Sequence, residues 1–202
     1  MEYVKYNTYS DFDEAKKQCR SCSIGLIYDQ VVLSEGNKDN PSVVIIGESP
    51  GATEIHLKRP FVGKAGKLLR RTLKESGLNR TNTLITNTIP CRPENNKFPK
   101  DTELVCRCRN IWLQEELRLL SPKVALLLGN IPLQYTIGLR GITRLRGNIY
   151  QKRLRINRHK MILIPTYHPS YVLRKEHMDD GKRIMSQFQE DIRKAAFLVG
   201  IL

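Results

Sequence analysis

The sequence predicts an α/β protein with a central, mainly parallel four-stranded sheet that helices cover on both faces. Three observations support this prediction: four short apolar runs, amphipathic patterns that separate or follow them, and polar residues at the ends of the runs. Strands that alternate with helices form parallel sheets, and continuous apolar runs are typical of strands buried on both faces. At a length of 202 residues, we expect one domain spanning residues 1–202.

The predicted strands are the four apolar runs Val43–Ile46, Thr83–Thr86, Val124–Leu128 and Met161–Ile164. Runs of this length suit buried strands better than helices. Pro165 directly follows the last run, and we expect it to end that strand because proline cannot donate to a ladder.

Helical periodicity predicts helices over Lys64–Ser76, Thr102–Leu120 and Asp180–Leu198. Gly77 ends the first pattern, and a Ser-Pro pair ends the second. Residues 140–160 are less regular, and their segments LRGNIY and KRLRI predict a short hairpin.

The chain is strongly basic: 34 Lys and Arg against 20 Asp and Glu give a formal net charge of +14. Arg140 to Lys160 contains eight basic residues and no acidic one. Nucleic acid is the simplest partner for such a chain, and the alternative is a solvated surface typical of a very basic proteome. No apolar stretch approaches the roughly 18 residues that span a bilayer. The polar N-terminus resembles no targeting peptide. We expect a cytoplasmic, nucleoid-associated protein without a membrane partner, nuclear only in a eukaryotic or viral setting.

Cysteine spacing predicts a metal centre. Cys19 and Cys22 form a C-x-x-C pair, Cys91 follows, and Cys106 and Cys108 offer a choice of fourth thiol. Four thiolates suit zinc or an iron–sulfur cluster. The wide spacing of the later cysteines favours a cluster, and buried free cysteines are the alternative.

Polar residues follow three of the predicted strands: Glu48 and Ser49, then Asn87, then His168. The carboxyl ends of parallel strands form the ligand crevice of an open sheet, so these residues should converge there. An Asn amide can read the planar edge of a pyrimidine. A neutral His can donate to a carbonyl oxygen that gains negative charge, and Phe61 can stack on a base. A turn histidine and a core phenylalanine are the alternatives at this point.

Three longer motifs make the chain similar to a known family. GESPGATEIHLKRPFVGKAG, TNTIPCRPENNKFP and PTYHPSYVLR resemble, in order, three motifs of the family 4 uracil-DNA glycosylases. With the cysteines, the resemblance runs from about Cys19 to the C-terminal helix. It implies a three-layer α/β/α sandwich. It also implies a monofunctional glycosylase that excises uracil from DNA, leaves an abasic site and initiates base excision repair without a catalytic divalent metal.

The resemblance assigns roles to residues of the crevice. It implies that Asn87 reads the uracil edge, that Phe61 stacks on the base, and that groups around Glu48 and Ser49 contact it. His168 would donate to uracil O2 as the glycosidic bond breaks.

The carboxylate that would hold or orient the water is Glu54. Here the chain departs from the family, because the uncharged Ala52 and Thr53 precede Glu54 where the family has a run of acidic residues. The catalytic carboxylates then reduce to Glu54 and Glu48.

The resemblance further implies a [4Fe–4S] cluster held by the C-x-x-C pair, Cys91 and a fourth cysteine. In the family, a fixed number of residues separates the third and fourth cysteine ligands. Counted from Cys91, this spacing leads to Arg107, which lies between Cys106 and Cys108. We favour Cys108, because apolar residues then take the places that usually follow this ligand.

The expected partner is uracil-containing DNA, single- or double-stranded, bound by a monomer. Gly63 and Lys64 are expected to contact DNA. A base that leaves the stack needs a wedge in its place. We expect the wedge in the loop after His168, formed by Tyr171, Val172, Leu173 and Arg174. A helix-capping loop is the alternative.

Three other functions stay open: excision of hypoxanthine or another deaminated base, covalent trapping of uracil, and DNA binding without catalysis. The segment PENNKFPK lacks the histidine found in trapping relatives. Binding DNA alone needs none of Asn87, Phe61 and His168.

Overall fold

The structure, a computed structural model, describes residues 4–27, 31–153 and 159–202. Within these ranges it contains a six-stranded sheet in the order β1-β3-β2-β4-β6-β5. Its four central strands are parallel and match the four predicted runs: β2 (Val43–Gly47), β3 (Thr83–Asn87), β4 (Val124–Leu128) and β6 (Lys160–Thr166). The predicted α/β fold with a mainly parallel sheet is confirmed, and the structure adds two antiparallel edge strands.

The edge strands are short. β1 (Glu35–Gly36) pairs with β3, and β5 (Tyr150–Arg153) pairs with β6. The expected hairpin within residues 140–160 is therefore wrong in its described part, because β5 covers the bare edge of β6 instead. The other arm of that hairpin falls largely on residues 154–158, which lie outside the described residues.

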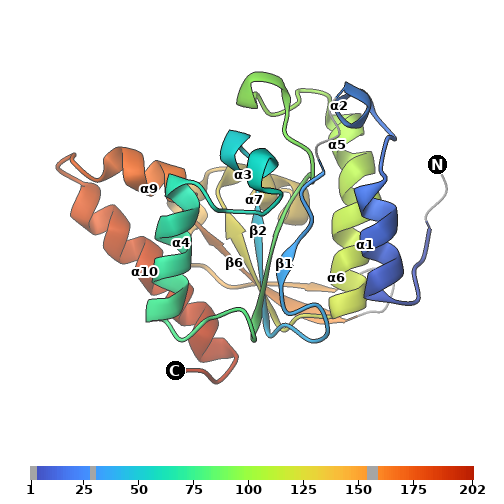
Figure 1. Cartoon of the computed structure of the whole chain (residues 1–202). Helices are drawn as coiled ribbons and strands as arrows, with labels where there is room; N and C mark the ends of the chain where they lie inside the picture. The colour runs from blue at the N-terminus through green and yellow to red at the C-terminus, as the bar shows by residue number, and fades with distance from the viewer. Residues whose placement is uncertain (1–3, 28–30, 154–158) are drawn as a thin grey trace.

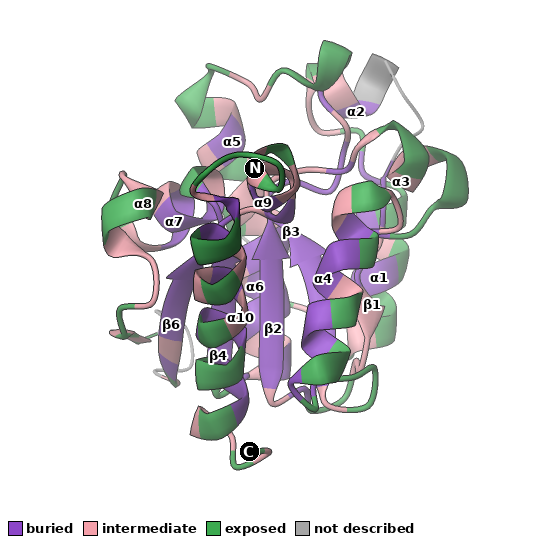
Figure 2. Ribbon diagram, turned by 90° about the vertical axis from the view of Figure 1, so that its left-hand side faces the viewer, coloured by how far each residue is buried: buried purple, intermediate pink, exposed green. Residues whose placement is uncertain are grey.

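Helices cover both faces of the sheet (Figure 1). One layer contains α4 (Lys64–Glu75), α9 (Pro169–Lys175) and α10 (Gly181–Leu198), and the other contains α1 (Tyr9–Lys17), α5 (Thr102–Cys108) and α6 (Gln114–Leu120). Side chains of β2 alternate between the two cores. Val43 and Ile45 pack with the α4–α10 layer, and Val44 and Ile46 pack with α6. Figure 2 shows the buried central strands behind α4 and α10.

The predicted helix over Thr102–Leu120 is present but not uniform. A π-helical turn, η2 (Arg109–Leu113), joins α5 to α6. A π turn holds one more residue than an α turn, so it rotates α5 relative to α6.

Strand β6 continues past the predicted end at Pro165, which pairs in register with Leu127 of β4. β5 pairs only as far as Leu163, so Pro165 lies where β6 has a strand neighbour on one side alone. A residue without an N–H is tolerated in such a position.

Several short helices had no prediction. They are α2 (Ser23–Ile27), α3 (Ala52–Leu57), η1 (Glu94–Asn96), α7 (Asn130–Ile137) and α8 (Ile142–Leu145). α3, α7 and α9 begin within a few residues of the carboxyl ends of β2, β4 and β6, and all three lie in the upper half of Figure 1. None of the helices in the described ranges is long and apolar enough to cross a membrane.

Candidate active site

A cavity of about 550 Å³ lies at the carboxyl ends of the parallel strands. It brings together residues that are far apart in the sequence, as the strand-end argument predicted. Its lining includes these predicted site residues: Glu48, Ser49, Glu54, Phe61, Asn87, His168 and Arg174.

Asn87, the last residue of β3, is nearly fully buried. Its Oδ1 has no hydrogen-bond partner among the residues that the structure describes. A buried acceptor without a partner is costly unless a ligand supplies a donor. Asn87 therefore presents an amide edge that a bound group with an N–H would satisfy.

Gly47, at the end of β2, leaves room for this edge. A Cβ added there would overlap Asn87 Oδ1 and would lie 2.5 Å from Cζ of Phe61. Any larger residue would displace the amide or the ring, so the two side chains require a glycine at this position.

Phe61 has a left-handed backbone with φ of 51°, and its side chain is buried. For a residue other than glycine, this conformation costs roughly 1–3 kcal/mol and marks functional sites. The ring lies 6.0 Å from the imidazole of His168, centroid to centroid, with 39° between their planes. A planar ligand can therefore be held between an aromatic face and polar groups.

His168 caps the N-terminus of α9 through its ring. Nδ1 accepts from the backbone N–H of Ser170 at 3.2 Å and lies 2.7 Å from Oγ of Ser170. Because a backbone N–H only donates, Nδ1 is unprotonated and the neutral ring holds its proton on Nε2.

Burial and, to a smaller extent, the charge of Arg174 together lower the pKa of His168 to about 4, against a smaller opposite effect of Glu54. The imidazole is therefore neutral at pH 7 and offers one N–H donor in the cavity.

The two predicted carboxylates differ in their surroundings. Burial raises the pKa of Glu48. Glu54 lies in the first turn of α3, and its Oε1 accepts from the backbone N–H groups of Val62 and Gly63 at 2.9 and 2.8 Å. This anchor fixes Glu54 against the loop that contains Phe61.

Sequence reasoning missed Asn96 and Ser170, both of which line the cavity. Asn96 has a φ of 55°, and its Oδ1 accepts from Nε of Arg92 at 2.8 Å. The signal for Asn96 was its place in the PENNKFP segment of the second motif. The signal for Ser170 was its position two residues after His168, where a helix N-terminus offers its N–H groups.

The expected wedge loop is a helix. Tyr171 to Arg174 belong to α9, because Pro169 suits the first helical turn. Val172 is buried in the core beneath α9, so its side chain is not available to DNA in this conformation. Arg174 is exposed at the cavity, and Tyr171 packs on Tyr167 at 5.2 Å.

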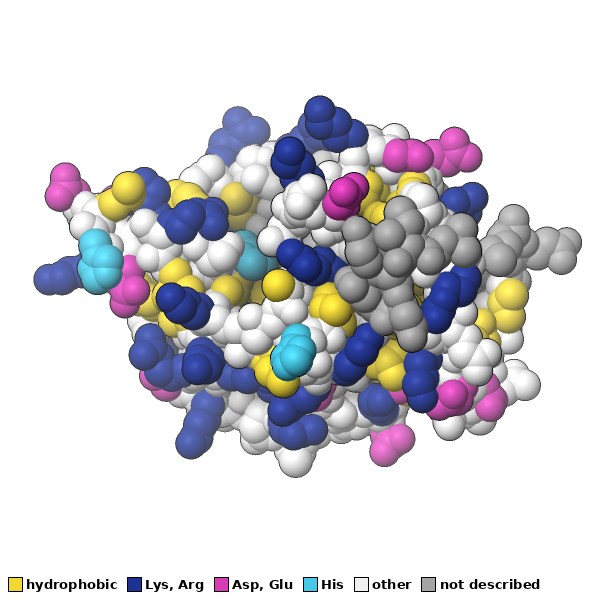
Figure 3. Space-filling model, turned by 45° about the horizontal axis from the view of Figure 1, so that its top comes forward, with side chains coloured by type: hydrophobic (Ala, Val, Ile, Leu, Met, Phe, Trp, Pro, Cys, Tyr) yellow, Lys and Arg dark blue, Asp and Glu magenta, His cyan; other side chains and the backbone are white. Residues whose placement is uncertain are grey.

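Basic side chains surround this end of the molecule. Figure 3 looks onto it and shows Lys and Arg gathered around a hollow. Lys64, at the start of α4, is exposed, and the adjacent Gly63 is partly exposed. Exposed cations around a cavity attract a polyanion.

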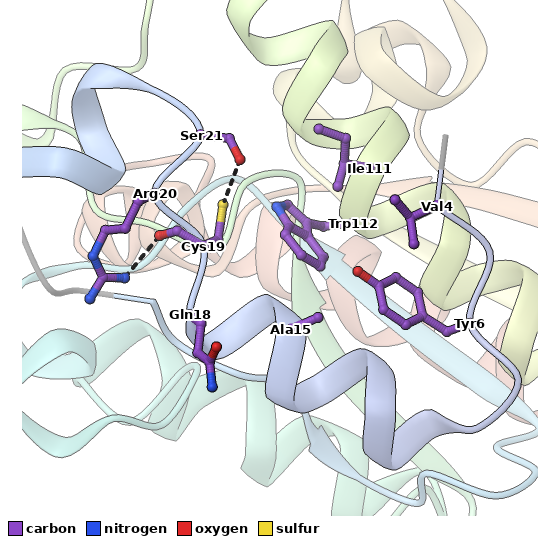
Figure 4. Close-up of a pocket in the computed structure, with 9 residues that line it drawn as sticks. All are labelled: Val4, Tyr6, Ala15, Gln18, Cys19, Arg20, Ser21, Ile111 and Trp112. Carbon is purple, nitrogen blue, oxygen red and sulfur yellow. Dashed lines mark hydrogen bonds between the residues drawn. The ribbon is translucent and has the colours of Figure 1, made fainter. Parts of the chain in front are cut away.

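The cysteines gather away from this cavity. Cys19 and Cys91 lie in a core cluster around Phe12 and Trp112, and Cys108 packs against it. Figure 4 shows Cys19 beside Trp112 in a pocket of about 370 Å³, where Oγ of Ser21 lies 3.7 Å from its Sγ.

The thiols influence one another. Burial raises the pKa of Cys91 to about 12, and the charges of Cys19 and Cys22 act in the same direction. Burial also raises the pKa of Cys108, and the charges of Cys91, Cys19 and Cys22 add to this effect. Cys106 packs with the cluster around Val105 and Tyr135, which Cys108 also contacts. Burial raises the pKa of Tyr135, and the charge of Cys106 acts in the same direction.

Neighbouring buried thiolates repel one another unless a metal centre neutralises them, so this donor set fits a thiolate-bound cofactor. In residues 4–27, 31–153 and 159–202, no three His, Cys, Asp or Glu side chains are already arranged to hold a metal ion.

The fold and the cavity define an α/β protein that can hold a planar heterocycle at the ends of its parallel strands. Comparison with known proteins identifies the family to which the chain belongs. Residues 33–193 match the model of the uracil DNA glycosylase superfamily. A type-4 uracil-DNA glycosylase from Thermotoga maritima is 36% identical over 96% of this chain and 95% of its own length. Proteins of that name from Archaeoglobus fulgidus (35% identical, 82% of this chain, 86% of theirs) and Sulfurisphaera tokodaii (32%, 88%, 80%) also match. The chain belongs to the uracil DNA glycosylase superfamily, as its motifs predicted.

Proposed function

We propose that this protein is a uracil-DNA glycosylase that hydrolyses the N-glycosidic bond of deoxyuridine in DNA and leaves an abasic site. The observation that supports this best is the unpaired Oδ1 of Asn87 in one cavity with Phe61 and a neutral His168. Relatives with this activity in their names cover nearly the whole chain.

Base choice rests on Asn87. Its Oδ1 accepts from the N3–H of uracil, and its amide N–H donates to O4. Cytosine offers an acceptor at N3 and a donor at C4, so it would face Asn87 with both groups mismatched. Sites built on such paired hydrogen bonds discriminate strongly, because a mismatch leaves buried polar groups without partners.

Bond cleavage rests on His168. When the bond between N1 of uracil and C1′ of the sugar breaks, its electron pair stays with uracil and negative charge gathers on O2. Nε2–H of the neutral imidazole donates to O2 and stabilises that charge without losing its proton. Phe61 stacks on the ring and holds it in line.

Water attacks C1′ of the sugar that is left behind, and the proton that it releases neutralises the uracil anion. Glu54 orients this water with the oxygen that does not bind Val62 and Gly63, and Glu48, together with main-chain groups of Ser49, lines the same space. Carboxylates at these positions also stabilise the cationic sugar.

The surrounding basic surface holds the DNA backbone. Gly63, Lys64 and Arg174 lie at the cavity end of the molecule, and phosphate contacts supply most of the affinity for DNA. Val172 is buried, so it cannot fill the gap that the extruded base leaves in the stack. We assign that role to the exposed Arg174 and to the partly exposed Tyr171 and Leu173 of α9. The protein acts as a single-domain monomer on single- or double-stranded DNA.

Cys19, Cys22, Cys91 and Cys108 would hold a [4Fe–4S] cluster, which supplies cross-links between segments distant in the sequence. Cys108→Ala should abolish the brown visible absorbance of the purified protein, whereas Cys106→Ala should retain it. The opposite pattern would assign the fourth ligand to Cys106.

The function is tested with a labelled oligonucleotide that contains one uracil, in single- and double-stranded form, in buffer with EDTA. Wild-type protein should yield alkali-sensitive sites, and His168→Ala should slow excision roughly 100- to 1,000-fold. Hypoxanthine-containing and undamaged oligonucleotides are the controls. Well-folded, cluster-loaded wild type that leaves uracil in place would refute the proposal.

A further inference from the structure

The left-handed backbone of Phe61 needs a restraint. Its φ of 51° is unfavourable for a residue with a side chain, so surrounding contacts must hold it. The ring has little freedom to shift, because it lies close to Gly47 and the amide of Asn87. A small backbone rotation at Phe61 would move the surface on which a base stacks.

Arg70 of α4 supplies this restraint. Its Nε donates to the carbonyl oxygen of Phe61 at 2.9 Å, and its Nη2 donates to that of Pro60 at 2.8 Å. One carbonyl belongs to the peptide before the Cα of Phe61 and the other to the peptide after it. A single rigid guanidinium therefore holds both peptide planes, and with them φ and ψ of Phe61.

Glu35 of the edge strand β1 orients this guanidinium. Its two oxygens accept from Nη1 and Nη2 of Arg70 at 3.3 and 3.1 Å. They also accept from Arg59, two residues before Phe61, at 2.9 and 3.0 Å. Burial alone would raise the pKa of Glu35, but Arg59 and Arg70 lower it overall, so the carboxylate is charged at pH 7.

We infer that Arg70, oriented by Glu35, is a positioning residue that holds the ring of Phe61 where the extruded base must stack. The expected effect on excision rests on the proposed function. The contacts that hold Phe61 in place do not depend on it. A one-ångström displacement of a positioning group can slow a reaction by up to about 100-fold. Arg70 itself lies outside the cavity lining and touches no substrate.

The chain provides a matched control. Nη2 of Arg80 lies 3.6 Å from Oε1 of the same Glu35, and the Arg80 side chain is 71% exposed. Arg70→Gln should lower kcat for uracil excision roughly 10- to 100-fold while KM stays within about threefold. Arg80→Gln should leave both constants unchanged. Equal loss in the two variants would mean that the charge around Glu35 matters, and would overturn the inference.

A double-mutant cycle tests whether Arg70 acts through Phe61. In the Phe61→Ala background, Arg70→Gln should lower kcat by less than about twofold, because no ring remains to be positioned. The same loss in both backgrounds would overturn the inference. If Arg70→Gln does not fold, the cycle is run with Arg70→Lys, which retains the charge but cannot hold both carbonyl oxygens.

Ring position is also measured without activity. The chain has five Phe residues, so 4-fluorophenylalanine labelling gives a simple fluorine NMR spectrum in which Phe61→Leu identifies the Phe61 signal. Arg70→Gln and Glu35→Gln should shift or broaden that signal, and Arg80→Gln should not. An unchanged signal would overturn the inference. A shifted signal in a protein whose wild type leaves uracil in place would reject the proposed function and retain the positioning role.

Discussion

Thr86 and Asn87 are neighbours on β3, yet they serve two different polar regions. Oγ1 of Thr86 donates to Glu116 at 2.8 Å, in a buried cluster where Ser34 and Lys16 also bind that carboxylate. Asn87 instead faces the cavity, and in the described ranges its Oδ1 accepts from no donor. Adjacent residues of a strand point to opposite faces, which is how one strand reaches both regions.

The two regions show what satisfied and unsatisfied polar groups do. Burial alone would raise the pKa of Glu116, but Lys16 and the hydroxyl donors around it lower it overall, so the cluster holds a charged and fully bonded carboxylate. Such a network contributes to stability and binds nothing further. The incomplete bonding of Asn87 leaves an acceptor that the N–H of a ligand can satisfy, so it contributes to recognition.

Of the changes that separate the two regions, Asn87→Asp should have the largest effect. Asp cannot donate to uracil O4, and it places a second acceptor beside it, so uracil excision should fall by about 100-fold or more. The melting temperature should change by only a few degrees. The measurement is single-turnover excision beside thermal unfolding.

Thr86→Val is the matched control on the neighbouring position. It removes the hydrogen bond to the charged Glu116 and the contact of Oγ1 with Oγ of Ser34 at 2.8 Å. The lost bond to the charged group alone should cost about 1.5–3 kcal/mol of unfolding free energy. Excision per folded molecule should stay within about twofold. A folded Asn87→Asp protein with unchanged uracil and cytosine kinetics would remove Asn87 from base recognition.

A second effect should appear in stability alone. Lys16→Met leaves the buried carboxylate of Glu116 without its cation, and should lower the free energy of unfolding by about 3–5 kcal/mol. Adding Glu116→Gln removes the unpaired charge and should restore part of the loss. Chemical denaturation of both variants measures this. A double variant less stable than Lys16→Met would show that Glu116 does not depend on Lys16.

The smallest effect concerns pH. The pKa of His168 is lowered from 6.5 to about 4 on folding, so the unfolded chain binds more protons between these values. The contribution of His168 to stability is therefore complete above pH 6.5 and is lost as the pH falls toward 4. Denaturation curves of wild type should show this loss, and His168→Gln should show less of it. Identical pH dependence in the two proteins would indicate an ordinary pKa for His168.

The sequence predicted the central sheet and the meeting of Glu48, Asn87 and His168, because buried parallel strands leave a local apolar signal and end at one edge. It did not predict β1, since two residues leave no periodic pattern. The bonds of Glu35 to Arg59 and Arg70 arise only when β1 adds to the edge of β3.

The start of α9 shows a different limit of prediction from the sequence. Histidine is an uncommon helix cap, so His168 followed by Pro169 indicated a turn rather than the first residues of a helix. The position of Asn96 depends on a left-handed loop that returns across the strand ends, which no local pattern encodes. The first outcome depends on a local but uncommon cap, and the second depends on the path of the loop.

The π turn between α5 and α6 has a consequence for comparing sequences. Because η2 holds an extra residue, the helix can accept a one-residue insertion before Arg109 without turning Leu113 and Leu117 of the following segment away from the sheet. Counting from Cys91 by the family spacing reaches Arg107, one position short of Cys108. With Cys108 as the proposed fourth ligand, an alignment of this helix needs a one-residue gap within residues 92–108, and a gapless alignment would place Arg107 at that ligand position.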